Sequence, residues 1–278
     1  MSNLRSDSGD RAHAPAAPAT RASAASTLLQ LWQDGRRFDA LSADLRPRTL
    51  SEGYDVQDAF IAMTGDVVAG WKLGVGSPAA MRKAGTERAL IGRLLGSRCT
   101  TVDFSAPAPI VTIAAARAVT VEFEIALVLG CDVKPGDAPG NLMDTVAAAH
   151  VGIELVLSRF VDRRTVGQPS FAADNVGFEA YLCGAQIDPH RIAEVVASVE
   201  VQLDGVCAAR GLYGDEAVDP LAALGHLFDH ARERGITLHR GDIVTTGAAA
   251  SPFDVFADEF EISAHYLDTG FSARVKSI

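Results

Sequence analysis

The sequence predicts an α+β protein with a β-rich sandwich or rolled-sheet core and a small N-terminal helical segment. Short strand-like patterns dominate from Ile110 onwards. The few helical patterns among them do not alternate regularly with the strands, which disfavours a doubly wound parallel sheet. We expect a disordered tail over 1–24, a helical and strand segment over 25–100, and a β-rich core carrying the candidate catalytic residues over 101–278.

The N-terminal elements are predicted from caps and alternation. Residues 1–24 are rich in Ala, Ser, Pro, Arg and Asp and lack the apolar centre of a secretory signal. Ser26 or Thr27 can cap a first helix, and Ser51 can cap a second. Residues 69–76 are expected to form a strand, because apolar residues alternate there with Lys72 and glycine.

The core elements follow in order along the chain. Period-2 or continuous apolar patterns predict strands at Ile110–Ile113, Val121–Leu129, Gly152–Leu157, Ala180–Gly184, Val199–Leu203, Ile243–Thr246 and Glu259–Tyr266. Helical patterns predict helices at Met143–His150, Arg191–Ala197 and Pro220–Arg234, and Gly235 is a typical C-terminal cap for the last of these.

Composition limits the classes of partner. The 25 basic and 35 acidic residues give a net charge of -10, which disfavours nucleic acid and anionic membrane surfaces. No apolar run reaches the roughly 18 to 20 residues that cross a bilayer. The four cysteines lie far apart without a CxxC pair. We therefore expect a cytoplasmic protein, and any anionic substrate would need local positive charge such as a metal ion.

Two glutamates share one face of a predicted strand. Strand geometry places Glu122 and Glu124 on one side and Val121, Phe123 and Ile125 on the other. Adjacent carboxylates in a partly buried setting repel each other unless a cation or a shared proton compensates. The alternative interpretation is an exposed strand end where both glutamates face water.

A third carboxylate, Glu154, interrupts a strand that is otherwise apolar. It could pair with Arg159 or Arg117 in the core, or it could join Glu122 and Glu124 around a cation. Three carboxylates without a nearby His or Cys favour a hard ion such as Mg²⁺ or Mn²⁺ over zinc.

Further polar residues are candidates for catalysis or substrate binding. Lys72 lies in an apolar strand, where a buried amine could contact a substrate carboxylate, although an exposed strand lysine is the alternative. Asp174 and Asn175 could supply polar contacts or simply form a turn. Thr246 and Gly247 end a short strand, where a hydroxyl and backbone N–H groups could hold a carboxylate, unless this is an ordinary turn.

One competing motif is rejected. Gly74-x-Gly76-x-x-Ala79 formally matches a dinucleotide-binding pattern. No βαβ series follows it, and no second strand ends in the acid expected for a ribose contact.

The ordered set of motifs resembles the hydratase and decarboxylase branch of the fumarylacetoacetate hydrolase superfamily. The matching elements are Tyr54-x-x-Gln57, Gly70-Trp71-Lys72-Leu73-Gly74, Glu122-x-Glu124, Glu154 with Ser158-Arg159, Asp174-Asn175, Asp219-Pro220-Leu221-x-x-Leu224, and Gly241-Asp242-Ile243-Val244-x-Thr246-Gly247.

This resemblance implies metal-binding, catalytic and substrate-binding roles for individual residues. Mg²⁺ or Mn²⁺ would bind Glu122, Glu124 and Glu154, and a small 2-oxo or enol acid would chelate it. Lys72 and Asp174 would be catalytic, and Lys72, Asn175, Thr246 and Gly247 would bind substrate. A chelated 2-oxo acid can form an enolate whose charge the metal stabilises. The resemblance also implies a homo-oligomer.

Two positions depart from the family pattern. Relatives tend to have an acid before glycine where this chain has Leu90-Ile91-Gly92, and serines where it has Val176-Gly177. The leading interpretation is a metal-dependent hydratase or decarboxylase of aromatic-compound degradation. The alternatives are an acylpyruvate C–C hydrolase of the fumarylpyruvate type and a noncatalytic partner or ligand-binding relative.

Overall fold

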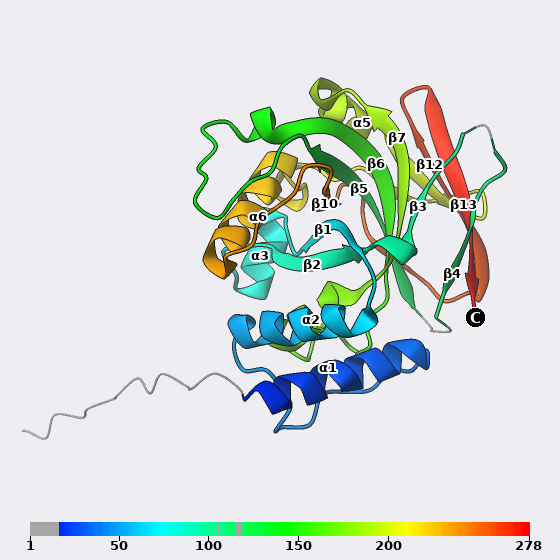
Figure 1. The fold of residues 1–278 in the computed structure, drawn as a ribbon. Helices are drawn as coiled ribbons and strands as arrows, with labels where there is room; N and C mark the ends of the chain where they lie inside the picture. Colours follow the sequence, from blue (N-terminus) through cyan, green and yellow to red (C-terminus); the bar gives the residue numbers. More distant parts are fainter. Residues whose placement is uncertain (1–16, 105, 115–117) are drawn as a thin grey trace, which may run out of the picture.

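Two helices at the start of the chain lie against one edge of a curved β structure (Figure 1). The computed structural model describes residues 17–104, 106–114 and 118–278. Helix α1 (Pro18–Gln33) packs on α2 (Leu50–Thr64). Residues 18–24, assigned to the tail from sequence, are therefore helical, while residues 1–16 lie outside the described residues.

Helix α2 begins at a different cap from the one predicted. The Thr49 side chain, rather than Ser51, accepts a hydrogen bond from Glu52 N. The Glu52 carboxylate in turn accepts from Arg48 N. Together these bonds satisfy backbone donors that the first turn of a helix leaves free, so the threonine followed three residues later by glutamate sets the start. Gly65, in the left-handed conformation, ends the helix.

Within the described residues, the strands form two sheets. The larger runs in the order β2-β1-β10-β5-β6-β7-β3, with β11 added beside β5, and the smaller runs β4-β13-β12-β8-β9. The bounds in the larger sheet are β1 (Val68–Gly74), β2 (Leu90–Leu95), β3 (Cys99–Thr101), β5 (Val119–Leu129), β6 (Val146–Val156), β7 (Phe178–Ile187), β10 (Ile243–Ala248) and β11 (Phe253–Val255). Those in the smaller sheet are β4 (Ile110–Ile113), β8 (Glu200–Leu203), β9 (Val206–Arg210), β12 (Glu259–Tyr266) and β13 (Thr269–Ser277).

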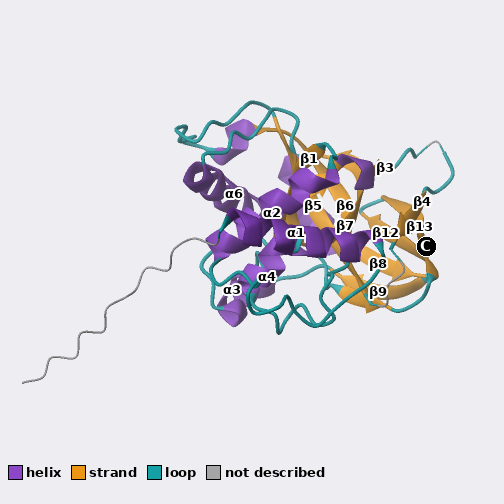
Figure 2. Ribbon diagram, turned by 60° about the horizontal axis from the view of Figure 1, so that its bottom comes forward, coloured by secondary structure: helices purple, strands orange, loops and turns teal. Residues whose placement is uncertain are grey.

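The remaining helices lie on the side of the molecule away from the smaller sheet, except for α5 (Figure 2). They are α3 (Pro78–Ala84), α4 (Gln168–Ala173), α5 (Ile192–Ser198) and α6 (Pro220–Arg234). Helix α6 has the predicted bounds: Asp219 caps its first turn, Pro220 occupies the first position, and Gly235 ends it in the left-handed conformation. No helix among the described residues is long and apolar enough to cross a membrane.

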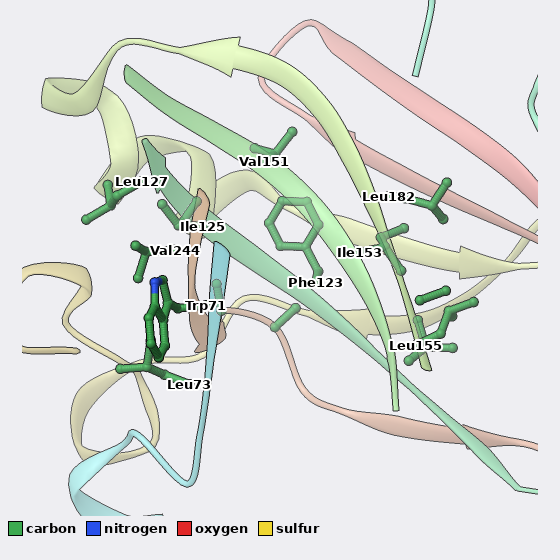
Figure 3. Packing of buried hydrophobic residues seen from close by; sticks show 14 of the residues in the cluster. Trp71, Leu73, Phe123, Ile125, Leu127, Val151, Ile153, Leu155, Leu182 and Val244 are labelled. Carbon is green, nitrogen blue, oxygen red and sulfur yellow. The ribbon is translucent and has the colours of Figure 1, made fainter. Parts of the chain in front are cut away.

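The main core lies between the two sheets. Phe123 and Ile125 on β5 and Ile153 on β6 point into it (Figure 3), beside β12 residues such as Ile262. Burial of each large apolar side chain contributes about 1.5–3 kcal/mol. The opposite face of β5 and β6 carries the three glutamates, and Ala126 on that face packs in a second cluster with residues of the N-terminal helices and β2. The predicted β-rich α+β class with a rolled sheet is confirmed.

One predicted helix is wrong. Residues 143–150 were expected to be helical, but a short 3₁₀ turn (Leu142–Thr145) leads directly into β6. The alanines there favour a helix locally, but β5 and β7 flank this segment and pair with it, as at Ala149, which is opposite both Leu127 and Ile187. Tertiary pairing therefore overrides propensity. Strands β2, β3, β9, β11 and β13 and helices α3 and α4 were not predicted.

Candidate metal centre and its cavity

Three glutamates meet on one face of the large sheet. Glu122 on β5 is directly opposite Glu154 on β6, and Glu124 is opposite Gly152. One carboxylate oxygen from each of Glu122, Glu124 and Glu154 lies within 4.8 Å of the others. Glu124 and Glu154 are fully buried, whereas Glu122 is partly exposed and lines a cavity of about 570 Å³. The exposed strand end considered from sequence is therefore wrong for Glu124.

The buried carboxylates have few protein partners among the described residues. Glu124 Oε2 accepts a hydrogen bond of 2.8 Å from Gly247 N, while Glu124 Oε1 has none. Glu154 Oε1 lies 2.6 Å from Lys72 Nζ as an ion pair, but the approach is not aligned as a hydrogen bond, and Oε2 has no partner. Among the described residues Glu154 thus pairs with Lys72, while Arg159 pairs with Asp174 instead, and Arg117 lies outside the described residues.

Burial and mutual repulsion act on both carboxyl groups. Burial, followed by the charges of Glu154 and Glu122, raises the pKa of Glu124 well above its usual value. Burial also raises the pKa of Glu154, although Lys72 opposes this. Buried anions that share a site need a compensating cation. The oxygen-only donor set and the unpartnered oxygens fit a hard divalent ion such as Mg²⁺ or Mn²⁺.

Lys72 reaches the cluster from β1. Its side chain is almost fully buried, and Nζ donates a 3.1 Å hydrogen bond to Val176 O. Gly92 on β2 is opposite Lys72, and a Cβ there would lie 2.8 Å from Lys72 Cγ. The glycine thus leaves room for the lysine stem. The alternative of an exposed strand lysine is wrong.

The turn after α4 is strained where it meets Lys72. Asn175 and Val176 have φ values of 50° and 51°, which is the left-handed region. Such a conformation is a genuine outlier for a β-branched residue such as valine and is often found at functional sites. In this turn it directs the Val176 carbonyl at Lys72 and places Val176 on the cavity wall.

Asp174 is placed in the core beside a cation. It is fully buried, accepts 2.7 Å from Ser158 Oγ, and forms an ion pair with Arg159. Burial raises the pKa of Asp174, and Arg159 opposes this. Asp174 does not line the cavity. Its observed contacts are those of a buried structural ion pair.

Asn175 and Thr246 also use their side chains internally. The Asn175 amide exchanges hydrogen bonds with Arg93 N and Arg93 O on β2, at 2.7 and 2.9 Å. Thr246 Oγ1 donates to Ile125 O at 2.8 Å. Neither residue lines the cavity, whereas Gly247 does. Of the expected substrate-binding residues, the structure brings Lys72 and Gly247 to the cavity.

Several cavity residues were missed from sequence. They are Ser77, Arg163, Phe171, Glu216 and Ser251, which lie in turns or on the short helix α4. Spacing gave no signal for them, because they come from separate segments of the chain. Arg163 lies six residues after Leu157, the end of the predicted strand that carries Glu154, and its sequence context shows only a cation in a polar segment.

The side chain of Ile91 lies away from the cavity beside the glutamates. On β2, Ile91 is opposite Leu73 and not Lys72, so its side chain lies on the face away from the glutamates. It lines a second cavity of about 740 Å³, together with Tyr54, His226 and His230. Of the Leu90-Ile91-Gly92 segment, Ile91 therefore belongs to this second cavity, whereas Leu90 and Gly92 lie on the face of Lys72. Val176 lines the first cavity.

A β-rich fold that gathers three carboxylates and a lysine around one cavity defines a candidate metal-assisted small-molecule enzyme. Residues 71–270 match the C-terminal domain of fumarylacetoacetate hydrolase. Because this match spans most of the chain, the protein belongs to the fumarylacetoacetate hydrolase family, as its motifs predict.

Curated relatives lie in the hydratase branch. A 2-keto-4-pentenoate hydratase of Burkholderia vietnamiensis is 30% identical over 186 residues, which cover 66% of this chain and 69% of the relative. The corresponding hydratase of Paraburkholderia phymatum is 30% identical over 189 residues, covering 67% and 70%.

Solved structures share the fold. 4-Oxalocrotonate decarboxylase from Pseudomonas putida G7, complexed with magnesium and adipate, superposes with a TM-score of 0.79 at 19% identity, covering 94% of this chain and 98% of that one. Fumarylpyruvate hydrolase from Pseudomonas aeruginosa, in complex with Mn²⁺ and pyruvate, gives 0.52 at 15% identity, covering 75% and 89%.

Proposed function

We propose that this protein is a divalent-metal-dependent lyase, a hydratase or decarboxylase, acting on a small 2-hydroxydienoate or 2-oxo acid from aromatic-compound degradation. The observation that carries the proposal is the set of buried carboxylate oxygens without partners, gathered beside Lys72 at one cavity. The hydratase activity of the curated relatives supports the same reaction class.

In this proposal Glu122, Glu124 and Glu154 hold Mg²⁺ or Mn²⁺. When bound, the ion supplies positive charge that stabilises negative charge developing on the substrate. Gly247 N orients Glu124 by donating to Oε2. This bond fixes one oxygen of Glu124 and leaves Oε1 without a hydrogen-bond partner among the described residues.

Lys72 is the proposed proton carrier. Its ammonium is held by Val176 O and Glu154, so Nζ has a defined position at the cavity wall. A positioned acid or base of this kind contributes about 10²–10⁴-fold to rate. Val156, Phe171 and Val176 line the cavity with apolar surface that limits water around the reacting atoms.

For Asp174, Asn175 and Thr246 we infer supporting roles. Asp174 holds Arg159, Asn175 holds the β2 backbone, and Thr246 holds β5. They would position the Val176 carbonyl and Gly247 rather than contact substrate. Asp174 would thus act through its neighbours, and not as the catalytic residue expected from sequence.

The test is turnover of a panel of 2-hydroxydienoates, 2-oxo dicarboxylates and acylpyruvates by metal-stripped protein, with and without Mg²⁺ or Mn²⁺. We expect metal to restore turnover, and Glu124→Gln to abolish both turnover and metal binding measured by calorimetry. Glu261→Gln is the matched control, because Glu261 is exposed on β12 and far along the chain from the cluster. Undiminished turnover in the metal-stripped protein would contradict the proposal.

The products distinguish the remaining candidates. Addition of water identifies a hydratase, and release of carbon dioxide identifies a decarboxylase. Cleavage of an acylpyruvate would instead favour the C–C hydrolase. Metal binding without turnover of any substrate would favour a noncatalytic partner, for which the unusual Val176 at the cavity wall is the relevant observation.

A further inference from the structure

The charged side chains that line the cavity are Lys72, Glu122, Arg163 and Glu216. Two of them are accounted for at the cluster, because Lys72 pairs with Glu154 and Glu122 belongs to the glutamate set. In the proposed function, a divalent ion and Lys72 together balance the three carboxylates. Arg163 is then the cation at this cavity that the cluster does not use.

Arg163 forms no ion pair or hydrogen bond with any other described side chain. It is half-buried in the turn after β6, and its guanidinium carbon lies 5.9 Å from the Phe171 ring centre. Asp162 and Asp254 line an adjoining recess with it, but neither forms an ion pair with Arg163, and Asp254 accepts a hydrogen bond from Thr120. Burial lowers the pKa of a second cation, Arg37, and the nearby charge of Arg163 lowers it further, while Asp174 and Asp254 oppose this.

A partly buried guanidinium without a carboxylate partner is well suited to binding one from a ligand. Its planar set of N–H donors matches a carboxylate with two parallel hydrogen bonds. Phe171 and Val156 line the same cavity and offer an apolar surface for a short carbon chain. The volume of about 570 Å³ lies within the range of small-molecule sites.

We propose that Arg163 binds the terminal carboxylate of the substrate, so that the preferred substrate class is a 2-oxo dicarboxylate rather than a monocarboxylate. This inference rests on the proposed function, in which the 2-oxo acid end lies at the glutamate cluster. Arg163 then sets specificity at the end of the molecule away from the glutamate cluster.

The test uses two unreactive probes with the same head group. 2-Oxohexanedioate and 2-oxohexanoate differ only in a terminal carboxylate, and their affinities are measured by calorimetry with and without Mg²⁺. We expect the wild-type protein to bind the diacid about 10- to 100-fold more tightly, as one charged hydrogen-bonded pair provides. Arg163→Gln removes this preference without weakening the monoacid, and Arg163→Lys retains part of it.

The neighbouring arginine provides the control. Arg164 is exposed and does not line the cavity, so Arg164→Gln makes the same charge change and should keep the preference. Equal affinity of the wild-type protein for both acids would overturn the inference. So would an equal loss for both acids in Arg163→Gln with an unchanged melting temperature. Failure of the proposed function is seen separately, as absent metal-dependent turnover, and leaves the two affinities measurable.

Discussion

Lys72 Nζ lies 2.6 Å from Glu154 Oε1, and both side chains are almost completely removed from solvent. The lysine is thus the protein's own compensation for a buried carboxylate in a cluster of three. Breaking a buried ion pair on one side leaves an uncompensated charge, which costs about 3–5 kcal/mol.

Replacement of this lysine tests both its structural and its catalytic role. Lys72→Met should lower the free energy of unfolding of the metal-free protein by about 3–5 kcal/mol and turnover by at least about 100-fold. Added Mg²⁺ should recover part of the stability, because the ion replaces the lost positive charge. Urea unfolding with and without Mg²⁺ measures this. Lys83→Met, at an exposed position on α3, should change neither quantity. Unchanged stability of Lys72→Met would show that the ion pair has no structural role.

Gly152 is expected to tolerate no side chain. It is opposite Glu124 on β5, and a Cβ there would lie 2.1 Å from Tyr181 Oη, whose ring is fully buried. Gly152→Ala should therefore destabilise the protein by about 1–3 kcal/mol, and should weaken metal binding by displacing Tyr181, which is opposite Glu154 on β7. Gly136→Ala is the control, since nothing lies within 4 Å of its added Cβ. Equal melting temperatures for the two variants would contradict the packing argument.

Substitution of Asp174 distinguishes a catalytic role for this residue from a structural one. Asp174→Asn leaves Arg159 buried without its ion-pair partner, so the free energy of unfolding should fall by about 3–5 kcal/mol. The KM of the folded fraction should stay close to that of the wild type. Denaturation curves and steady-state kinetics on the same preparation distinguish the outcomes. A large loss of kcat at unchanged stability would restore the catalytic role expected from sequence.

The part of the site built on one sheet could be predicted from sequence. Period-2 geometry placed Glu122 and Glu124 on one face, and the interruption of an apolar strand identified Glu154. These relationships depend only on strand geometry and neighbouring strands. The predicted α6 boundaries were likewise local, because Asp219 and Gly235 are caps.

Relationships across distant segments could not be predicted. The Val176 carbonyl meets Lys72 from a turn 104 residues away, and its left-handed conformation has no sequence signal at a valine. Asp174 looked available because nothing in the sequence showed Arg159 folding back onto it. The helix predicted over 143–150 was wrong for a related reason. Pairing with β5 and β7, and not the helix propensity of its alanines, decides the conformation of this segment.

His230 should make stability depend on pH. Burial and the charges of Arg93, Arg234 and Arg88 lower its pKa from 6.5 to about 3. The ring packs 4.5 Å from the Tyr54 ring, and Nε2 has no hydrogen-bond partner among the described residues. The unfolded chain therefore binds a proton below pH 6.5 that the folded protein does not bind until about pH 3.

Because of this difference in proton binding, the free energy of unfolding falls as the pH falls. His230 contributes stability above about pH 6.5, and this contribution is lost as pH falls toward 3, by up to about 1.4 kcal/mol per pH unit. His230→Phe keeps an aromatic ring against Tyr54 and removes the titrating group, so its free energy of unfolding should fall less between pH 6.5 and 4. Urea titrations across this range compare it with His265→Phe, which changes an exposed histidine on β12. Parallel curves for the wild type and His230→Phe would show that another group controls acid unfolding.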